Sequence, residues 1–233
     1  MAIVNYNVIS IGNYAFRNCS ALTSITIPNS VSSIGSYAFA FTGLTSITVP
    51  DSVISIASYA FAGCRALTGI TLPFVGTSKT EIGGPYALFG VIFGRDNYTG
   101  GTRAVQWFRA YFGSVYTYDY IDYYIPASLR TVIITDASAL RSGAFSNCVA
   151  LTGITISGSV SDIGDRAFYN CGALANVAIP ALVTSMGESA FYGCGSLTDI
   201  YYAGSEGQWN AVSGLAEAYI PEGATIAYNH AGG

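Results

Sequence analysis

Apolar positions recur along the chain in one register, at intervals of 22 or 23 residues with a single longer gap. An Ala-Phe pair marks each repeat, Cys or Thr follows three residues after the Phe, and a segment of the Leu-x-x-Ile-x-Ile type comes next. The six Phe positions are Phe16, Phe39, Phe61, Phe145, Phe168 and Phe191. Self-similarity at a fixed period of this length is typical of a solenoid, in which each repeat forms one coil of a stack.

Each repeat predicts one short strand followed by a turn. Ile25 and Ile27 alternate with Thr26, which is the period-2 pattern of a strand with one buried face. Pro28 ends the strand because it has no N–H to donate to the next coil. A second apolar stretch then returns the chain to the Ala-Phe turn. A single coil could not bury these residues alone, whereas a stack buries them against two neighbours.

The predicted fold is a β-rich α/β repeat solenoid of roughly seven coils, each of 22–23 residues, with one continuous parallel sheet. The side chains that face outward from this sheet are small and polar, so we expect a flat face that is not a tight binding site by itself. They include Ser24, Thr26, Ser46, Thr48, Gly153 and Thr155.

Two motifs carry a resemblance to a known family. The segment from Ile34 to Phe39 reads IGSYAF, and the segment from Cys64 to Pro73 reads CRALTGITLP. With their equivalents, which cover about three quarters of the chain, they resemble the bacterial BspA-type (Treponema-type) leucine-rich repeats. The resemblance implies a leucine-rich-repeat solenoid that is secreted or attached to a bacterial surface, with adhesion and protein binding as the expected role.

The longer gap, from Phe61 to Phe145, contains a disguised coil. Residues 82–89 match the Ile-Gly-x-Tyr-Ala-Phe turn, and Leu129 begins a segment that matches the strand. Residues 90–128 therefore form an excursion inserted just before that strand, and Gly100-Gly101 predicts a hairpin turn within it. The expected organisation is N-terminal coils in 1–89, the insertion in 90–128, C-terminal coils in 129–204 and a C-terminal cap in 205–233.

The excursion is rich in Tyr, Trp, Phe and Arg. One interpretation is structural, with these aromatic residues forming the excursion's own small core against the solenoid. The other is a binding surface, because Tyr, Trp and Arg dominate interface hot spots. In that case the excursion would lean over the Thr-rich face and wall a groove. The candidate ligand-binding residues are Trp107, Arg109, Tyr116 and Tyr118.

Composition and charge exclude other classes of binding. The chain is 51% hydrophobic and 9% charged, and its net charge of −4 comes without clustered Lys or Arg. Nucleic-acid binding normally needs such a cluster, so we expect none. The longest uncharged run, residues 18–50, is broken by Pro28 and dense in Ser and Thr, so no membrane-inserted helix is expected.

We expect no catalytic, cofactor-binding or metal site, and no enzyme activity. The single histidine, His230, lies four residues from the end in what reads as a tail, which leaves Ser or Cys nucleophiles without a base. The five cysteines recur at one coil position, which predicts a ladder of buried free thiols rather than disulfides. The carboxylate pairs Asp119/Asp122 and Asp162/Asp165 come with no desolvating pocket that would support general acid–base catalysis.

The C-terminal segment predicts a cap. Ser205 followed by Gln208 is a capping-box pattern that opens a short helix, and residues 224–228 read as a last strand. Trp209 is expected to plug the core at this end, because solenoids need a terminal cap for solubility.

The expected function is that of a non-catalytic, extracellular protein-binding or adhesion-type module of a bacterial surface or secreted protein, whose signal peptide is not in this chain. Its partner would be a protein, such as a host or neighbouring-cell surface protein. A structural spacer or stalk segment of a larger surface protein is the alternative, and a glycan-binding module is a third. The oligomeric state stays open.

Overall fold

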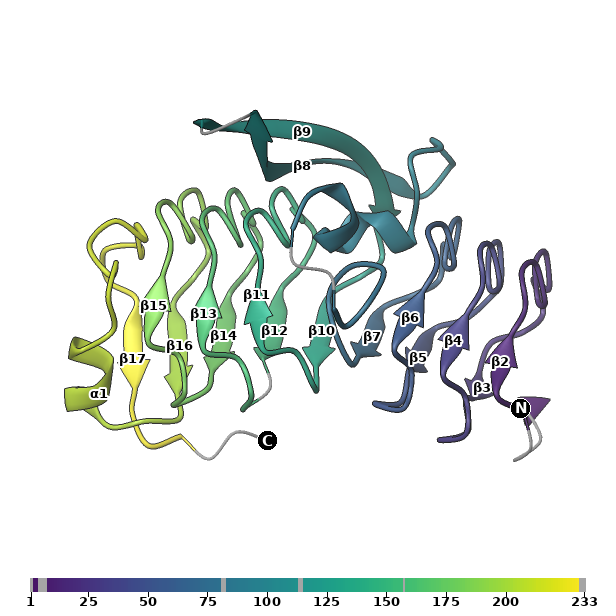
Figure 1. The fold of residues 1–233 in the computed structure, drawn as a ribbon, viewed down its shortest axis with the longest axis horizontal. Coiled ribbons are helices and arrows are strands. Elements are labelled where there is room, and N and C mark those ends of the chain that lie inside the picture. The colour runs from purple at the N-terminus through teal and green to yellow at the C-terminus, as the bar shows by residue number, and fades with distance from the viewer. Residues whose placement is uncertain (1, 4–7, 81–82, 113–114, 157, 231–233) are drawn as a thin grey trace.

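The computed structural model describes residues 2–3, 8–80, 83–112, 115–156 and 158–230, and it is a β-solenoid of about nine turns with almost no helix (Figure 1). Each turn places one parallel strand on a common front face. These strands are β1 Ala2–Ile3, β3 Ile25–Thr26, β5 Ser46–Thr48, β7 Gly69–Leu72, β10 Thr131–Ile134, β12 Gly153–Ile156, β14 Asn176–Ile179, β16 Asp199–Tyr202 and β17 Thr225–Ala227. The predicted fold class is confirmed. There are more turns than the predicted seven, because the segments at the two ends also form strands in the stack.

The front strands are split between two sheets, so the prediction of one continuous sheet is wrong. The first sheet pairs β1 with β3, and the second runs in the order β17-β16-β14-β12-β10-β7-β5. Strand β10 pairs with β7 on one side and β12 on the other, with Val132 beside both Ile70 and Ile154. The disguised coil is therefore in register with its neighbours, as its Leu-x-x-Val-x-Ile pattern predicted.

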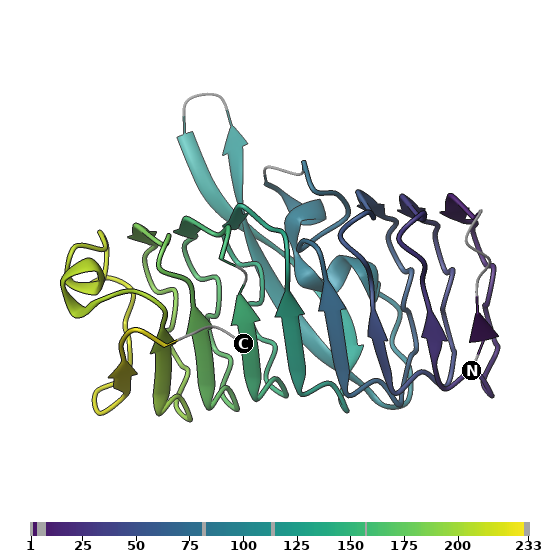
Figure 2. The ribbon, with the colours of Figure 1, turned by 90° about the horizontal axis from the view of Figure 1, so that it is seen from below.

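The second apolar stretch of each coil forms a row of two-residue strands behind the front face. These are β2 Ser10–Ile11, β4 Ser33–Ile34 and β6 Ser55–Ile56 in one sheet, and β11 Ala139–Leu140, β13 Asp162–Ile163 and β15 Ser185–Met186 in another. In each of them the second residue is apolar and buried. The two rows of strands enclose the core between them (Figure 2).

The Phe residues of the Ala-Phe turns stack through the middle of this core. Phe145 and Phe168 lie 5.6 Å apart between ring centroids with nearly parallel planes, and Phe168 and Phe191 lie 5.1 Å apart. All three are fully buried. In the regular coils the Phe N–H donates to an Ala carbonyl of the next coil, as from Phe168 to Ala190 at 2.8 Å. Each turn is thus fixed by ring stacking and by backbone hydrogen bonds.

The turns share a backbone conformation that requires left-handed residues. The residues two before and two after the Phe have positive φ, as at Arg166 (φ 56°) and Asn170 (φ 57°) around Phe168. Asn tolerates this conformation and Gly adopts it freely, whereas bulky residues are disfavoured there. Glycine stands two residues before the Phe in only one Ala-Phe turn, at Gly143.

The cysteines form the predicted ladder of buried free thiols, with one exception. Cys64, Cys148, Cys171 and Cys194 are buried and unpaired, whereas Cys19 is free but exposed. The Cys171 thiol donates to the carbonyl of Phe145, in the coil before it, at 3.1 Å. A small polarizable thiol therefore fills the site and also satisfies a buried carbonyl.

The excursion is a long antiparallel hairpin preceded by two 3₁₀ helices. The helices are η1 Pro85–Ala87 and η2 Phe89–Ile92, and the hairpin strands are β8 Gly101–Phe112 and β9 Val115–Pro126. Prediction of the hairpin turn at Gly100-Gly101 was wrong. The strands pair from Gly101↔Pro126 out to Phe112↔Val115, so Gly100-Gly101 lies at the open base of the hairpin. There it turns the chain into β8, with φ 92° at Gly100.

The hairpin was expected to lean over the Thr-rich sheet, but it lies across the Ala-Phe turns instead (Figures 1 and 2). The reason is a set of specific contacts with turn residues such as Asn147, whose Nδ2 donates to the carbonyl of Val105 at 2.6 Å. The far part of the hairpin projects past the row of short back strands (Figure 2). The front sheet is left uncovered by it.

The C-terminal cap forms as predicted. Helix α1 Glu206–Asn210 begins at a complete capping box between Ser205 and Gln208. Trp209 is buried and packs edge-on against Tyr202, with ring centroids 5.1 Å apart. The tail beyond β17 is ordered at His230. The backbone N–H of His230 donates to the carbonyl of Tyr202 at 3.1 Å, and its ring stacks on that of Tyr201 with the centroids 4.6 Å apart.

Candidate interaction site on the hairpin

The turn that carries the excursion keeps the stack continuous by using two Phe residues in place of one. Phe93 lies beside Phe61 on one side, and Phe89 lies beside Phe145 on the other. The N–H of Phe61 donates to Ile92, and the N–H of Phe89 donates to Ala144. The predicted equivalence of Phe89 with the ladder Phe residues is therefore correct on the C-terminal side only. Helix η2 widens the turn between the two rings and makes room for the hairpin.

Gln106 of β8 enters the solenoid core beneath this widened turn. It is fully buried, its Oε1 accepts the N–H of Gly90 at 2.6 Å, and its Nε2 lies 3.3 Å from the carbonyl oxygens of both Ala144 and Ser146. The amide group thus supplies both an acceptor and a donor to the backbone of two separate coils. A buried polar side chain with this many partners fixes the position of the strand that carries it.

One edge of β8 is bound to the solenoid. The Trp107 N–H donates to Ser146 Oγ at 3.0 Å, beside the bond from Asn147 to Val105. The carbonyl oxygen of Trp107 lies so close to Gly143 that a Cβ atom there would meet it at 1.6 Å. The equivalent position holds Arg166 in the next turn, at a φ of 56°, so the approach of the hairpin is what requires glycine at Gly143.

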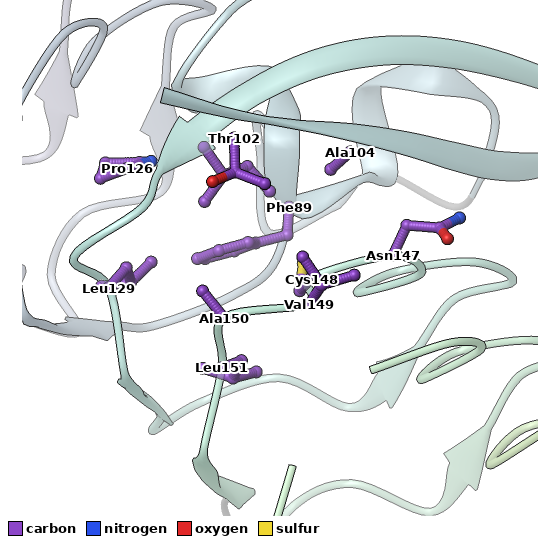
Figure 3. Close-up of a pocket in the computed structure, with 11 residues that line it drawn as sticks. Phe89, Thr102, Ala104, Pro126, Leu129, Asn147, Cys148, Val149, Ala150 and Leu151 are labelled. Atoms are coloured by element: carbon purple, nitrogen blue, oxygen red, sulfur yellow. The ribbon is translucent and has the colours of Figure 1, made fainter. Parts of the chain in front are cut away.

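An apolar seam closes the base of the hairpin against the next turn. Figure 3 shows Phe89 between Thr102 of β8 and Ala150 of the solenoid, with Cys148 and Leu151 nearby. The free volume in this seam is about 10 Å³, which is the space of about one water. The seam is a packing contact, and it has no room for a ligand.

Of the four predicted ligand-binding residues, Trp107, Arg109 and Tyr118 lie together on the outer face of the hairpin. The register pairs Arg109 with Tyr118 and Trp107 with Tyr120, so these four side chains share one face. The backbone of Tyr116 is part of β9, but its side chain lies outside the described part of the structure. Tyr120, which the sequence analysis missed, is 57% exposed and packs 5.4 Å from Trp107. Alternation along β9 would have placed it beside Tyr118.

Arg109 and Tyr118 contact the solenoid as well. Arg109 forms an ion pair with Asp165, and the Tyr118 hydroxyl donates to the same carboxylate at 2.9 Å. The guanidinium of Arg166 lies 3.9 Å from the centroid of the Tyr118 ring and 5.6 Å from that of Trp107. Burial raises the pKa of Tyr118, and its hydrogen bond to Asp165 raises it further. Arg109 and Tyr118 therefore help to fasten the hairpin, whereas Trp107 and Tyr120 extend its outer surface.

A polar depression of about 360 Å³ lies beside these contacts. Its lining includes two cations and two carboxylates, from Arg109, Arg141, Asp162 and Asp165. No histidine lines it, and Asp165 is already engaged by Arg109 and Tyr118. The described residues hold no group of three or more His, Cys, Asp or Glu side chains placed to bind a metal ion. The depression therefore offers charged groups and hydrogen-bonding groups of both kinds.

The front sheet has a groove of about 500 Å³ in its C-terminal half. Thr155, Ala178 and Tyr201 contribute to its lining, together with Leu182 and the His230 ring that stacks on Tyr201. The outward Thr and Ser residues are exposed or half-buried, as predicted. This part of the sheet is nevertheless less flat than predicted, because the tail lies on it. Among the described residues, no helix is both long and apolar enough to span a bilayer.

The stacked parallel strands and the ladder of turn residues define a leucine-rich-repeat solenoid. The family model of the BspA type leucine-rich repeat region matches residues 2–84 and 123–211 in six copies, and the chain belongs to this family. The unmatched middle, residues 85–122, covers the 3₁₀ helices, all of β8 and most of β9. No curated protein matches the chain.

The chain is also similar to solved structures of leucine-rich-repeat proteins from bacteria. One from Bacteroides ovatus is 19% identical over 97% of this chain and 53% of its own, with a TM-score of 0.49. A leucine-rich cell surface protein from Faecalibacterium prausnitzii is 25% identical over 91% of this chain and 62% of its own, with a TM-score of 0.34. The leucine-rich repeat protein of T. pallidum is 19% identical over 97% of this chain and 68% of its own, with a TM-score of 0.33. The chain spans 53% and 62% of the length of the first two.

Proposed function

We propose that this chain acts outside a bacterial cell as a non-catalytic protein-binding module of a surface or secreted protein, with the hairpin as its contact element. The observation that carries the proposal is the rigid mounting of the hairpin, which leaves Trp107 and Tyr120 adjacent on its outer face. Trp and Tyr give a large contact area for little loss of side-chain entropy. A partner of this kind would be a host protein or a protein on a neighbouring cell.

The second candidate is a structural spacer, and it is favoured by the contacts of Arg109 and Tyr118 with Asp165. In that case the hairpin would only stiffen the solenoid, and its outer face would have no partner. The two candidates differ in what they require of Trp107 and Tyr120. A binding module needs both rings, whereas a spacer loses little stability when these partly exposed side chains are truncated.

The test compares two aromatic truncations at separate places. The purified chain is assayed by surface plasmon resonance against a panel of secreted and cell-surface proteins. The double variant Trp107→Ala/Tyr120→Ala is then assayed against the proteins that bind. Tyr192→Ala is the control, because Tyr192 is 48% exposed on a turn outside the hairpin. We expect the double variant to lose at least tenfold in affinity while it melts close to the parent and while the control binds normally. Equal binding by all three proteins would exclude the hairpin as the contact element.

A further inference from the structure

We propose that the outer edge of β9, from Tyr118 to Asp122, takes up an extended segment of a protein partner as a third strand, with Lys or Arg of that segment beside Asp119. The proposal rests on the function proposed above and specifies its mode of binding. It starts from the difference between the two edges of the hairpin. The edge of β8 is bound to the solenoid through the Trp107 N–H and the Val105 carbonyl.

The register determines which groups of β9 face outward. Directly opposite residues in an antiparallel pair alternate between pairs that bond to each other and pairs whose N–H and C=O groups point away. Trp107 and Tyr120 form a pair of the second kind, because the Trp107 N–H binds Ser146 outside the hairpin. Tyr118, Asp122 and Tyr124 have the same parity as Tyr120, so the backbone groups of all four point away from β8.

Only the base of this edge is covered by the rest of the described chain. The Tyr124 N–H donates to the carbonyl of Gly94 at 2.9 Å, which extends the sheet there by one contact. Between Tyr118 and Asp122, the one backbone hydrogen bond that the described residues make on this edge is local. It runs from the Tyr120 N–H to Oδ1 of Asp119 at 2.8 Å. Tyr118, Tyr120 and Asp122 thus offer three N–H groups and three carbonyls to an added strand, and the Tyr120 N–H would exchange its local bond to Asp119 for a bond to that strand.

The outer part of the hairpin is suited to a third strand. Its side chains alternate between Tyr and Asp or Ile, so it has the β-forming residues that strand pairing favours. Thr117, Asp119 and Tyr120 are exposed, and this part of the hairpin projects past the back strands of the solenoid (Figure 2). A two-stranded ribbon is only marginally stable where nothing supports it, and a third strand would stabilise this part.

Charge determines the class of occupant. Asp119 is exposed and its carboxylate contacts its own backbone neighbour, whereas Asp122 is paired with Arg103 at 2.9 Å. The free negative charge on the edge therefore attracts a basic residue on the incoming strand. A second copy of this chain fits less well, because edge-to-edge pairing of two β9 strands would bring the two Asp119 carboxylates together without a basic partner from either strand, in a chain of net charge −4.

The experiment uses the whole chain and two pools of ten-residue peptides rich in Thr and Val. Each peptide of the first pool contains one Lys, and each peptide of the second pool contains one Glu at the matching position. We expect the Lys pool to bind about fivefold more tightly than the Glu pool. We also expect slower hydrogen exchange at the amides of Tyr120 and Asp122 when the Lys pool is bound. Asp119→Lys should reverse the preference between the pools.

Two variants at one position separate edge pairing from face contact. Tyr120→Ala removes the ring and keeps the outward N–H, whereas Tyr120→Pro removes both without breaking a bond to β8. The Pro variant should bind the Lys pool about tenfold more weakly than the Ala variant, because an added strand loses a hydrogen-bond donor. Equal binding by the two variants, binding by neither pool, or protection confined to the solenoid would overturn the proposal. Protection of these amides that rises with protein concentration in the absence of peptide would also overturn it, because the occupant of the edge would then be a second copy of the chain.

The outcomes also separate this inference from the proposed function. If Trp107→Ala/Tyr120→Ala weakens binding of a protein partner while Tyr120→Pro binds that partner as well as Tyr120→Ala, the outer face is the contact and strand addition is wrong. If none of these variants changes partner binding, both the proposed function and strand addition at β9 are wrong.

Discussion

The coil that carries the hairpin and the regular coils around Phe168 fill the core and bond the backbone at equivalent positions, but they use different side chains to do so. In the regular coils one Phe ring, one Ala carbonyl and one thiol fill each level of the stack. In the interrupted coil two Phe rings share the level, and the amide of Gln106 bonds the backbone where the turn is widened. The stack thus requires that each position be filled and each buried polar group be bonded, whereas the residue that does so can come from far along the chain.

The largest effect is expected from emptying a regular level. Phe168→Ala removes a fully buried ring between two stacked neighbours and should lower the free energy of unfolding by about 3–5 kcal/mol. Chemical denaturation measures the loss. Phe16→Ala is the matched control, since Phe16 is only half-buried and stacks on Phe39 alone, and it should cost clearly less. An equal loss from both would show that ring burial does not determine the stability of a level.

The next effect concerns the interrupted level. Gln106→Ala leaves the Gly90 N–H and the carbonyls of Ala144 and Ser146 without their side-chain partner, and should destabilise by about 2–3 kcal/mol. Val105→Ala is the control, because its half-buried side chain lies on the opposite face of the same strand. Hydrogen exchange should quicken first at Gly90 and in β8. A Gln106 variant as stable as the control would show that the hairpin is held by its apolar seam.

A smaller effect separates backbone strain from docking of the hairpin. Gly143→Ala and Gly193→Ala both put a side chain where φ is near 70°, at 68° and 76°. Only Gly143 faces the hairpin, since its Cβ would meet the Trp107 carbonyl at 1.6 Å, whereas the nearest atom to a Cβ at Gly193 is the Asn170 Cα at 3.1 Å. Each should lose about 1 kcal/mol from strain. The Gly143 variant should lose about 1 kcal/mol more and become open to proteolysis within the hairpin. Equal losses with an intact hairpin would contradict this docking.

The smallest change is expected from pH in the neutral range. Burial raises the pKa of Cys194 to about 12, and it raises the pKa values of Cys148 and Cys171 as well, above the ordinary value of 9.0. Since the thiolate is the reactive form, native protein should react with thiol reagents at Cys19 alone, at pH 7 and at pH 8. The buried thiols keep their protons to a higher pH in the folded protein than in the unfolded protein. Their contribution to the free energy of unfolding is therefore fully present below pH 9 and falls as pH rises above it.

Mass spectrometry after timed labelling checks this prediction, with denatured protein as the control that labels all five cysteines. Rapid native labelling of Cys148 but not Cys171 would sharpen the comparison in a different way. It would mean that the level beneath the hairpin opens while the regular levels stay closed.

The amino-acid sequence alone was sufficient to determine the solenoid, the register of the disguised coil and the C-terminal cap. The physical reason is local repetition. Each coil has the same alternation, the same Phe and the same turn, so the register read from one coil applies to the next. Leu129 and Val132 therefore placed β10 correctly across the insertion, and the capping box placed the start of α1 at Ser205.

Only the tertiary structure determined where the hairpin lies, because its position depends on contacts between residues far apart in the chain. Gln106 bonds residues around 40 positions away, and Arg109 and Tyr118 meet at Asp165. Alternation could have placed Trp107 and Tyr120 on one face, but no local pattern shows that β8 turns its edge to Gly143. A periodic sequence specifies neighbours through repetition, whereas an insertion without a repeat must find its site by matching shape and hydrogen bonds in the folded stack.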